Sequence, residues 1–241
     1  ITLNNANAFT GAVSLNTTGS SAHATVVDAS GLNLGASTVG GNLSATATTG
    51  NMQNSGVLTI AGTSSFTTSA DNADIWLNSA NAFTGAVSLN TTGSSAHATV
   101  VDASGLDLGA STVGGNLVAT ATTGNITDSG VLTINGMIFS FTTSANNATI
   151  TLDNANVFNG AVSLNTTGSS AHATVVDASG LNLAASTVGG NLSATAITGN
   201  ISDSGNLAVT GTSSFTTSAT DGTITLNNAN AFTGAVALNT T

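Results

Sequence analysis

Apolar and polar residues alternate along most of the chain in short runs. Residues 13–15 read Val-Ser-Leu, residues 32–34 read Leu-Asn-Leu and residues 43–47 read Leu-Ser-Ala-Thr-Ala. A period of two places every second side chain on one face, which is typical of a β-strand with one buried side. Gly, Asn, Ser and Asp gather between the runs, where turns favour these residues. The pattern predicts an all-β chain of short strands without helices.

The pattern itself recurs at a much longer interval. One position is marked by four phenylalanines at a nearly constant spacing: Phe9, Phe83, Phe158 and Phe232. The residues at 13–32 also return unchanged at 87–106 and at 162–181. Recurrence at a fixed period is the signature of a repeat architecture. We therefore divide the chain into three full repeats and the start of a fourth: 1–74, 75–149, 150–223 and 224–241.

Each repeat divides again into four blocks that end near glycines, which gives a second period of about 18–19 residues. Blocks of this length with two or three short strands each are typical of a β-solenoid, in which every coil pairs with the coils above and below it. The sequence therefore predicts one continuous solenoid over residues 1–241, with four coils per repeat. At ~4.8 Å per coil the rod would be roughly 60 Å long.

Tandem β-sandwich domains are the alternative fold. Independent domains of this kind need linkers between the repeats and a buried aromatic side chain in each copy. The joins between repeats show no linker, and the single tryptophan is not repeated. The solenoid is the better interpretation.

The composition narrows the range of functions. The chain has no Lys, Arg, Cys or Pro, and its ten acidic residues give a net charge of -10. Nucleic-acid binding needs clustered cationic side chains, so we expect no nucleic-acid partner. Attachment to an anionic membrane surface fails for the same reason, and no apolar run approaches the ~20 residues that span a bilayer. We expect no membrane insertion.

The only three histidines, His23, His97 and His172, lie one repeat apart. Ligands of one zinc ion must lie ~2 Å from it, so histidines in different repeats cannot share a metal. A catalytic triad needs several groups to converge on one place, and three copies of one would be unusual. We expect hydrogen-bonded polar residues at the edge of a turn, and we expect no enzyme activity and no catalytic residue.

The aspartates Asp28, Asp102 and Asp177 follow the same spacing. Carboxylates at turns are calcium ligands in many proteins, which makes these three residues weak calcium candidates. The nonapeptide calcium repeat of some β-helices is missing, and solvated turn residues are the favoured interpretation. We expect no other metal and no cofactor.

Two surface positions stand out as interaction candidates. Trp76 replaces a threonine of the other repeats, and its apolar neighbours Ile75 and Leu77 should turn it outward. An outward tryptophan can stack on a sugar or anchor a protein partner, although drift at one surface position explains it as well. A one-residue insertion gives a second candidate, a bulge that would expose a small apolar patch: Met137, Ile138 and Phe139.

Segments such as GAVSLNTTG at 11–19, GGNLSATATTGN at 40–51 and GVLTI at 56–60 resemble the repeat regions of large secreted bacterial surface proteins, namely filamentous-haemagglutinin-like adhesins and autotransporter passengers. The resemblance implies a right-handed parallel β-helix and an extracellular or cell-surface location. An Arg-Gly-Asp element and a basic heparin site both require residues that this chain lacks.

Three functions follow as hypotheses. The first is the non-catalytic shaft of an adhesin, where a host or matrix glycan or protein would be bound by regions outside this segment. The second is a self-assembling subunit of an extracellular filament or sheath, whose partner is a second copy associating end to end or laterally. The third is a solenoid face that binds glycan or ice.

Overall fold

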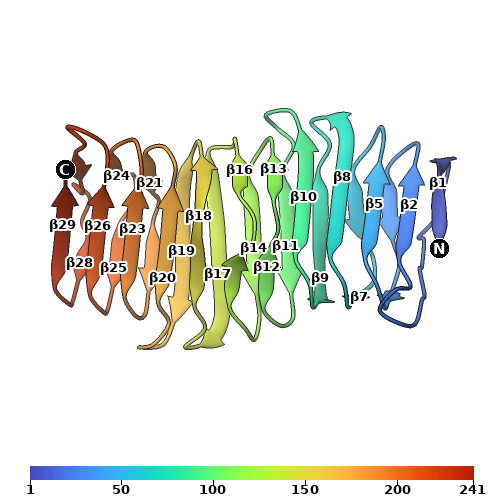
Figure 1. The fold of residues 1–241 in the computed structure, drawn as a ribbon, viewed down its shortest axis with the longest axis horizontal. Coiled ribbons are helices and arrows are strands. Elements are labelled where there is room, and N and C mark those ends of the chain that lie inside the picture. The colour runs from blue at the N-terminus through green and yellow to red at the C-terminus, as the bar shows by residue number, and fades with distance from the viewer.

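The computed structural model is a rod of stacked strands with the two chain ends at opposite ends of the rod (Figure 1). It contains 29 β-strands and no helix, and the strand pairings are parallel. The predicted parallel β-solenoid is confirmed, and the alternative of β-sandwich domains is wrong because the pairing runs without a break from the first strand to the last.

The strands form two long sheets. The first sheet has 14 strands: β1 (Thr2–Asn7), β2 (Ala24–Asp28), β5 (Leu43–Ala47), β8 (Ser64–Asp71), β10 (Val87–Thr92), β12 (Leu106–Leu108), β13 (Ser111–Val113), β15 (Ile126–Asp128), β16 (Leu132–Ile134), β18 (Ile150–Phe158), β20 (Ala173–Asp177), β23 (Leu192–Ala196), β26 (Ser213–Thr217) and β29 (Val236–Thr240). The second sheet has 15 strands: β3 (Leu32–Leu34), β4 (Ser37–Val39), β6 (Met52–Asn54), β7 (Leu58–Ile60), β9 (Ile75–Phe83), β11 (Ala98–Asp102), β14 (Leu117–Ala121), β17 (Ile138–Asn146), β19 (Ala161–Thr167), β21 (Leu181–Leu183), β22 (Ser186–Val188), β24 (Ile201–Asp203), β25 (Leu207–Val209), β27 (Ile224–Thr225) and β28 (Ala231–Phe232).

The turns of the solenoid are longer than the sequence predicts and unequal in length. Ala24 pairs with Leu43, Leu43 with Ser64 and Ser64 with Val87, so each of these successive turns is longer than the one before it. The chain makes about 11 turns of ~21 residues each. The prediction of 18–19 residues per coil and four coils per repeat is therefore wrong. With ~4.8 Å between neighbouring strands, the rod is about 53 Å long.

Successive repeats face opposite ways. Ala24 lies in β2 of the first sheet, its equivalent Ala98 lies in β11 of the second sheet, and the next equivalent, Ala173, returns to the first sheet in β20. Between Ala24 and Ala98 the chain visits the sheets alternately, so that a repeat spans three and a half turns instead of four. Figure 1 shows the result at the edges of the rod, where β8 ends at the upper edge and its equivalent β17 at the lower one.

The core is a single thin apolar layer between the two sheets. It is one cluster of 48 buried residues that runs through all the repeats. Inward positions are mainly Val, Leu, Ile and Ala, and aromatic rings meet in the layer near each repeat boundary, two at the first and the last boundary and three at the middle one. The Phe66 and Phe83 ring centroids lie 5.8 Å apart, as do those of Phe215 and Phe232.

Glycines allow neighbouring turns to touch at the corners. A Cβ on Gly40 would lie 2.6 Å from the backbone oxygen and 2.7 Å from the backbone nitrogen of Gly19, which belongs to the preceding turn. Gly19 itself has φ +98, a conformation that side chains other than glycine rarely adopt. The close approach of two backbones explains why the sequence has Gly at both places.

Candidate functional site

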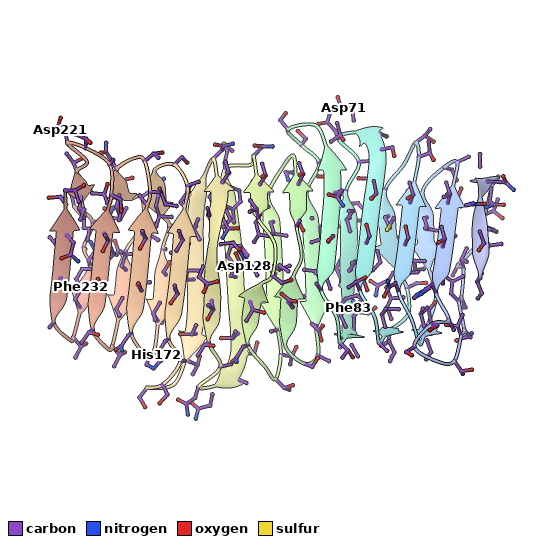
Figure 2. The ribbon with its side chains drawn as sticks, viewed as in Figure 1. Asp71, Phe83, Asp128, His172, Asp221 and Phe232 are labelled. Atoms are coloured by element: carbon purple, nitrogen blue, oxygen red, sulfur yellow. The ribbon has the colours of Figure 1, made fainter.

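The histidines brace adjacent turns. In each repeat the imidazole Nδ1 accepts a hydrogen bond from a backbone N–H of the following turn, at 2.8–2.9 Å: His23 from Asn42, His97 from Asn116 and His172 from Asn191. The prediction of a hydrogen-bonded residue at the edge of a turn is confirmed. Because equivalent residues of successive repeats lie on opposite faces of the rod, the three histidines do not share a line along it. His172 lies at the lower edge of the rod (Figure 2).

The aspartates Asp28, Asp102 and Asp177 are fully buried, so the expectation of solvated side chains is wrong. In the first repeat Asp28 Oδ1 accepts from the Ser30 backbone N–H and hydroxyl, both at 2.9 Å, and Oδ2 accepts from the Phe9 N–H at 3.1 Å. The carboxylate thus joins its own turn to the preceding one. Burial raises the pKa of Asp102 and of Asp177, against the opposing effect of their hydrogen bonds.

No three His, Cys, Asp or Glu side chains come together in a group that would suit a metal ion. At the weak calcium candidates, the contacts of the carboxylates are donors from the chain itself: Ser30 and Phe9 for Asp28, and Ser104 and Phe83 for Asp102. The geometry of these residues supports a structural role.

A second set of buried polar residues escaped the sequence analysis. Asn81 accepts hydrogen bonds from the Asn54 side chain at 2.7 Å and from the Leu58 N–H at 2.9 Å. In the later repeats aspartate replaces Asn54: Asn156 donates to Asp128, and Asn230 donates to Asp203, each at 2.7 Å. These ladders satisfy polar groups inside the corners of the solenoid.

The two aspartates of these ladders differ in acidity. Burial raises the pKa of Asp128 even though Asn156, Asp153 and Asn154 donate to it. Burial also acts to raise the pKa of Asp203, but the combined hydrogen bonds from Asn230, Asn227 and Asn228 outweigh it, so its pKa is lowered.

Trp76 lies on the outer face of the second sheet, as the sequence predicts. Its neighbours Ile75 and Leu77 are fully buried, whereas Trp76 is 36% exposed. It pairs in register with Gln53 of β6, and Gln53 pairs with Asn33 of β3. These three side chains belong to successive turns and form one outward row.

The row borders the only pocket of the structure, a shallow hollow of ≈ 280 Å³. Its lining combines one aromatic ring, three side-chain amides and a stretch of backbone: Gly31, Leu32, Asn33, Asn51, Gln53 and Trp76. The Asn33 Oδ1 atom is buried and has no hydrogen-bond partner. Sequence reasoning found Trp76 but missed Gln53, although Gln53 is the only glutamine of the chain.

The insertion is exposed only in part. Met137 is 78% and Ile138 56% exposed, but Phe139 is fully buried, so its prediction as a surface residue is wrong. Phe139 takes the inward position that Ser64 holds in the first repeat, and its ring lies 5.7 Å from that of Phe158. The extra residue is accommodated at the exposed corner, while the strand that follows keeps its inward pattern.

A family model described as repeats of unknown function (DUF5649) matches residues 21–90, 95–165 and 170–239. These segments make up most of the chain. The chain belongs to this family. Each matched DUF5649 segment begins just before β2, β11 or β20 and ends within β10, β19 or β29, so that the family repeat corresponds to the unit of three and a half turns.

Comparison with curated proteins and with solved structures finds no match. The DUF5649 description names no activity, so the match shows only that this chain is built of such repeats. The chain also has no helix of the length and apolarity needed to cross a membrane.

Proposed function

We propose that the chain is the non-catalytic shaft of a secreted or cell-surface adhesin. The observation that carries this proposal is the unbroken strand register across the repeat boundaries. Ser64 of the first repeat pairs with Val87 of the second, and Phe141 of the second pairs with Leu164 of the third. A rod whose backbone pairing continues through every boundary transmits position and load along its whole length, as a spacer must.

The distribution of polar groups supports the same role. The histidines and the buried Asp28 and Asp102 hold neighbouring turns together through hydrogen bonds to the backbone, whereas Asp177 bonds only to Ser179 of its own turn. These groups recur at every repeat, three and a half turns apart, and they do not converge on a shared place. A spacer needs such bracing in every unit, whereas an enzyme needs its reactive groups together once.

The composition of the chain is compatible with an extracellular setting. The chain has no Lys or Arg and therefore no trypsin cleavage site, and its stability does not depend on a disulfide because it has no Cys. Its resemblance in sequence to the shafts of filamentous-haemagglutinin-like adhesins and autotransporter passengers supports the same location.

The test combines location with shape. Antibodies against the purified chain should label intact, unpermeabilised cells of the source organism, and small-angle scattering should show a monomeric rod about 53 Å long. Labelling only after permeabilisation would reject the proposed location. Growth of the purified chain into fibres would reject the isolated shaft in favour of the self-assembling filament.

A further inference from the structure

The single tryptophan and the single glutamine of the chain are neighbours in space. Trp76 stands where the other repeats have Thr2, Thr151 and Thr225, and Gln53 stands where they have Thr127 and Ser202. The two residues lie far apart in the sequence, yet they pair in register on adjacent turns. Two unique departures from a repeated surface therefore meet at one place.

These substitutions create the hollow. The equivalent place in the third repeat has Asn182, Ser202 and Thr225, and no pocket is found there. The Asn182 Oδ1 atom is unpaired too, so it is the two longer side chains that set the first place apart. Ser and Thr side chains are too short to enclose a hollow on the outer face of the sheet. The indole of Trp76 and the side chain of Gln53 extend further from the sheet and form its sides. The resulting volume of ≈ 280 Å³ lies just below the range of sites for drug-sized ligands, about 300–1,000 Å³, which suits a single small ring.

The lining provides two kinds of contact. The half-exposed indole of Trp76 offers a flat apolar surface. The amides of Asn33, Asn51 and Gln53 offer both donors and acceptors. Asn51 Oδ1 is occupied by the Asp74 N–H at 2.9 Å, and the Asn33 Oδ1 atom is buried out of reach of a ligand, so the contacts of a bound molecule fall mainly to the Gln53 amide and the Asn51 side-chain NH₂ group.

The charge around the hollow selects against anions. The chain has no cationic side chain other than its histidines, and Asp74 lies directly beside Asn51. A phosphate or an acidic sugar would find no counter-ion and would be repelled. A molecule with a flat C–H face, several hydroxyl groups and no charge satisfies all of these conditions.

We propose that the hollow beside Trp76 binds one neutral pyranose ring of a glycan. The ring stacks on the indole, and its hydroxyl groups bond to the amides of Gln53 and Asn51. The site lies on the side of the rod, so it is independent of the proposed role as a shaft: a shaft without it would remain a shaft.

The chain carries its own reporter for this test. Trp76 is the only tryptophan and Tyr is absent, so the intrinsic fluorescence comes from the proposed site. The purified chain is titrated with neutral disaccharides built from glucose, galactose, mannose or N-acetylglucosamine, and with one that contains glucuronic acid. We expect a saturable change in emission with at least one neutral disaccharide and binding about tenfold weaker for the acidic one.

Two variants provide matched controls. Gln53→Ser introduces the residue of the third repeat and should weaken binding roughly tenfold without loss of the β-sheet signal in circular dichroism. The double variant W76T/T151W moves the tryptophan to the equivalent place on β18, where its register neighbour is Thr127 instead of Gln53. Its emission should not respond to sugar.

Either of two results would overturn the proposal. The first is the absence of a saturable response in the parent chain up to about 20 mM of every neutral disaccharide. The second is an equal response in W76T/T151W, which would show contact with any exposed indole instead of binding in the hollow.

Discussion

Ala24 and Ala98 hold the same place in successive repeats, but they lie in opposite sheets of the solenoid. The cause is the length of the repeat, because three and a half turns end on the far side of the rod from where they began. After two repeats the chain is back on the face where it began. Asp71 and Asp221 belong to the same corner two repeats apart, and Figure 2 shows both along the same edge of the rod.

Pairs of spin labels can measure this alternation. Thr25 and Thr174 lie on the same outer face seven turns apart, so cysteines at these positions should give a label distance of about 34 Å. Cysteines at Thr25 and Thr99 should lie about 17 Å apart along the rod but on opposite faces, which the core of ~10 Å and the outward labels separate further. We expect a distance above about 25 Å for this pair by double electron–electron resonance. A peak at about 19 Å would instead indicate four full turns per repeat.

Two buried serines should be replaceable with a gain in stability. Ser64 and Ser213 point into the core, and neither hydroxyl has a hydrogen-bond partner. An unpaired buried hydroxyl is costly, so Ser64→Ala and Ser213→Ala should each stabilise the chain by about 1 kcal/mol. Guanidinium denaturation measures the change. Ser65→Ala, at the neighbouring outward position, is the control and should have little effect; a loss of stability in the core variants would indicate an undetected partner.

The chain should be more stable in mild acid than at neutral pH. Burial raises the pKa of Asp102, Asp128 and Asp177 above the ordinary value of 3.8. Between 3.8 and the raised values the folded state binds more protons than the unfolded state, so stability falls as pH rises through this window. Asp203, whose pKa is lowered, acts oppositely and loses its contribution below pH 3.8. The denaturation midpoint should therefore increase from pH 7 toward pH 4.

The three buried carboxylates can be separated from the general effect of the net charge. The triple variant D102N/D128N/D177N should lose most of the rise in midpoint on acidification. Asp221→Asn is the control, because Asp221 is exposed and the other repeats have Asn72 and Asn147 at this place with nearly the same positive φ. It should retain the full pH dependence. An equal loss per charge removed in the two variants would assign the effect to net charge alone.

The contact between turns at Gly40 should be intolerant of a side chain. The Cβ of Gly40→Ala would meet the backbone of Gly19, which cannot move aside as a side chain can. We expect a loss of about 1–3 kcal/mol by chemical denaturation. Gly11→Ala is a matched control, because nothing lies within 4 Å of its Cβ. Equal stability of the two variants would mean that the corners are looser than the structure shows.

The fold class could be predicted because the alternation along each strand reports directly which side chains are buried. The length of a turn could not, because alternation does not reveal how the strands are grouped. The predicted coils were too short because each repeat was divided into a whole number of glycine-bounded blocks, whereas the repeat spans three and a half turns. Short strands such as Leu32–Leu34 and Ser37–Val39 lie in the same sheet with only Gly35 and Ala36 between them, so glycines do not always mark the end of a turn.

Of the residues at the candidate site, only Trp76 could be predicted from the sequence. Ile75 and Leu77 determine the outward direction of Trp76 from within its own strand. Gln53 and Asn33 reach the same place through pairing between turns, and the unequal lengths of those turns hide the pairing from the sequence. The inward position of Phe139 follows from Phe141, two residues further along the same strand, because the extra residue is taken up at Met137 and Ile138 and the alternation of the strand is kept.

The half-integral number of turns also bears on how such an array changes its copy number. Because residues 13–32 and 87–106 are identical, a whole repeat can be added or removed without creating a new junction in the chain. Gain or loss of two repeats would alter only the reach of the rod. Gain or loss of one would rotate everything C-terminal to it by half a revolution, so that a feature which had faced one side, such as Trp76, would face the other.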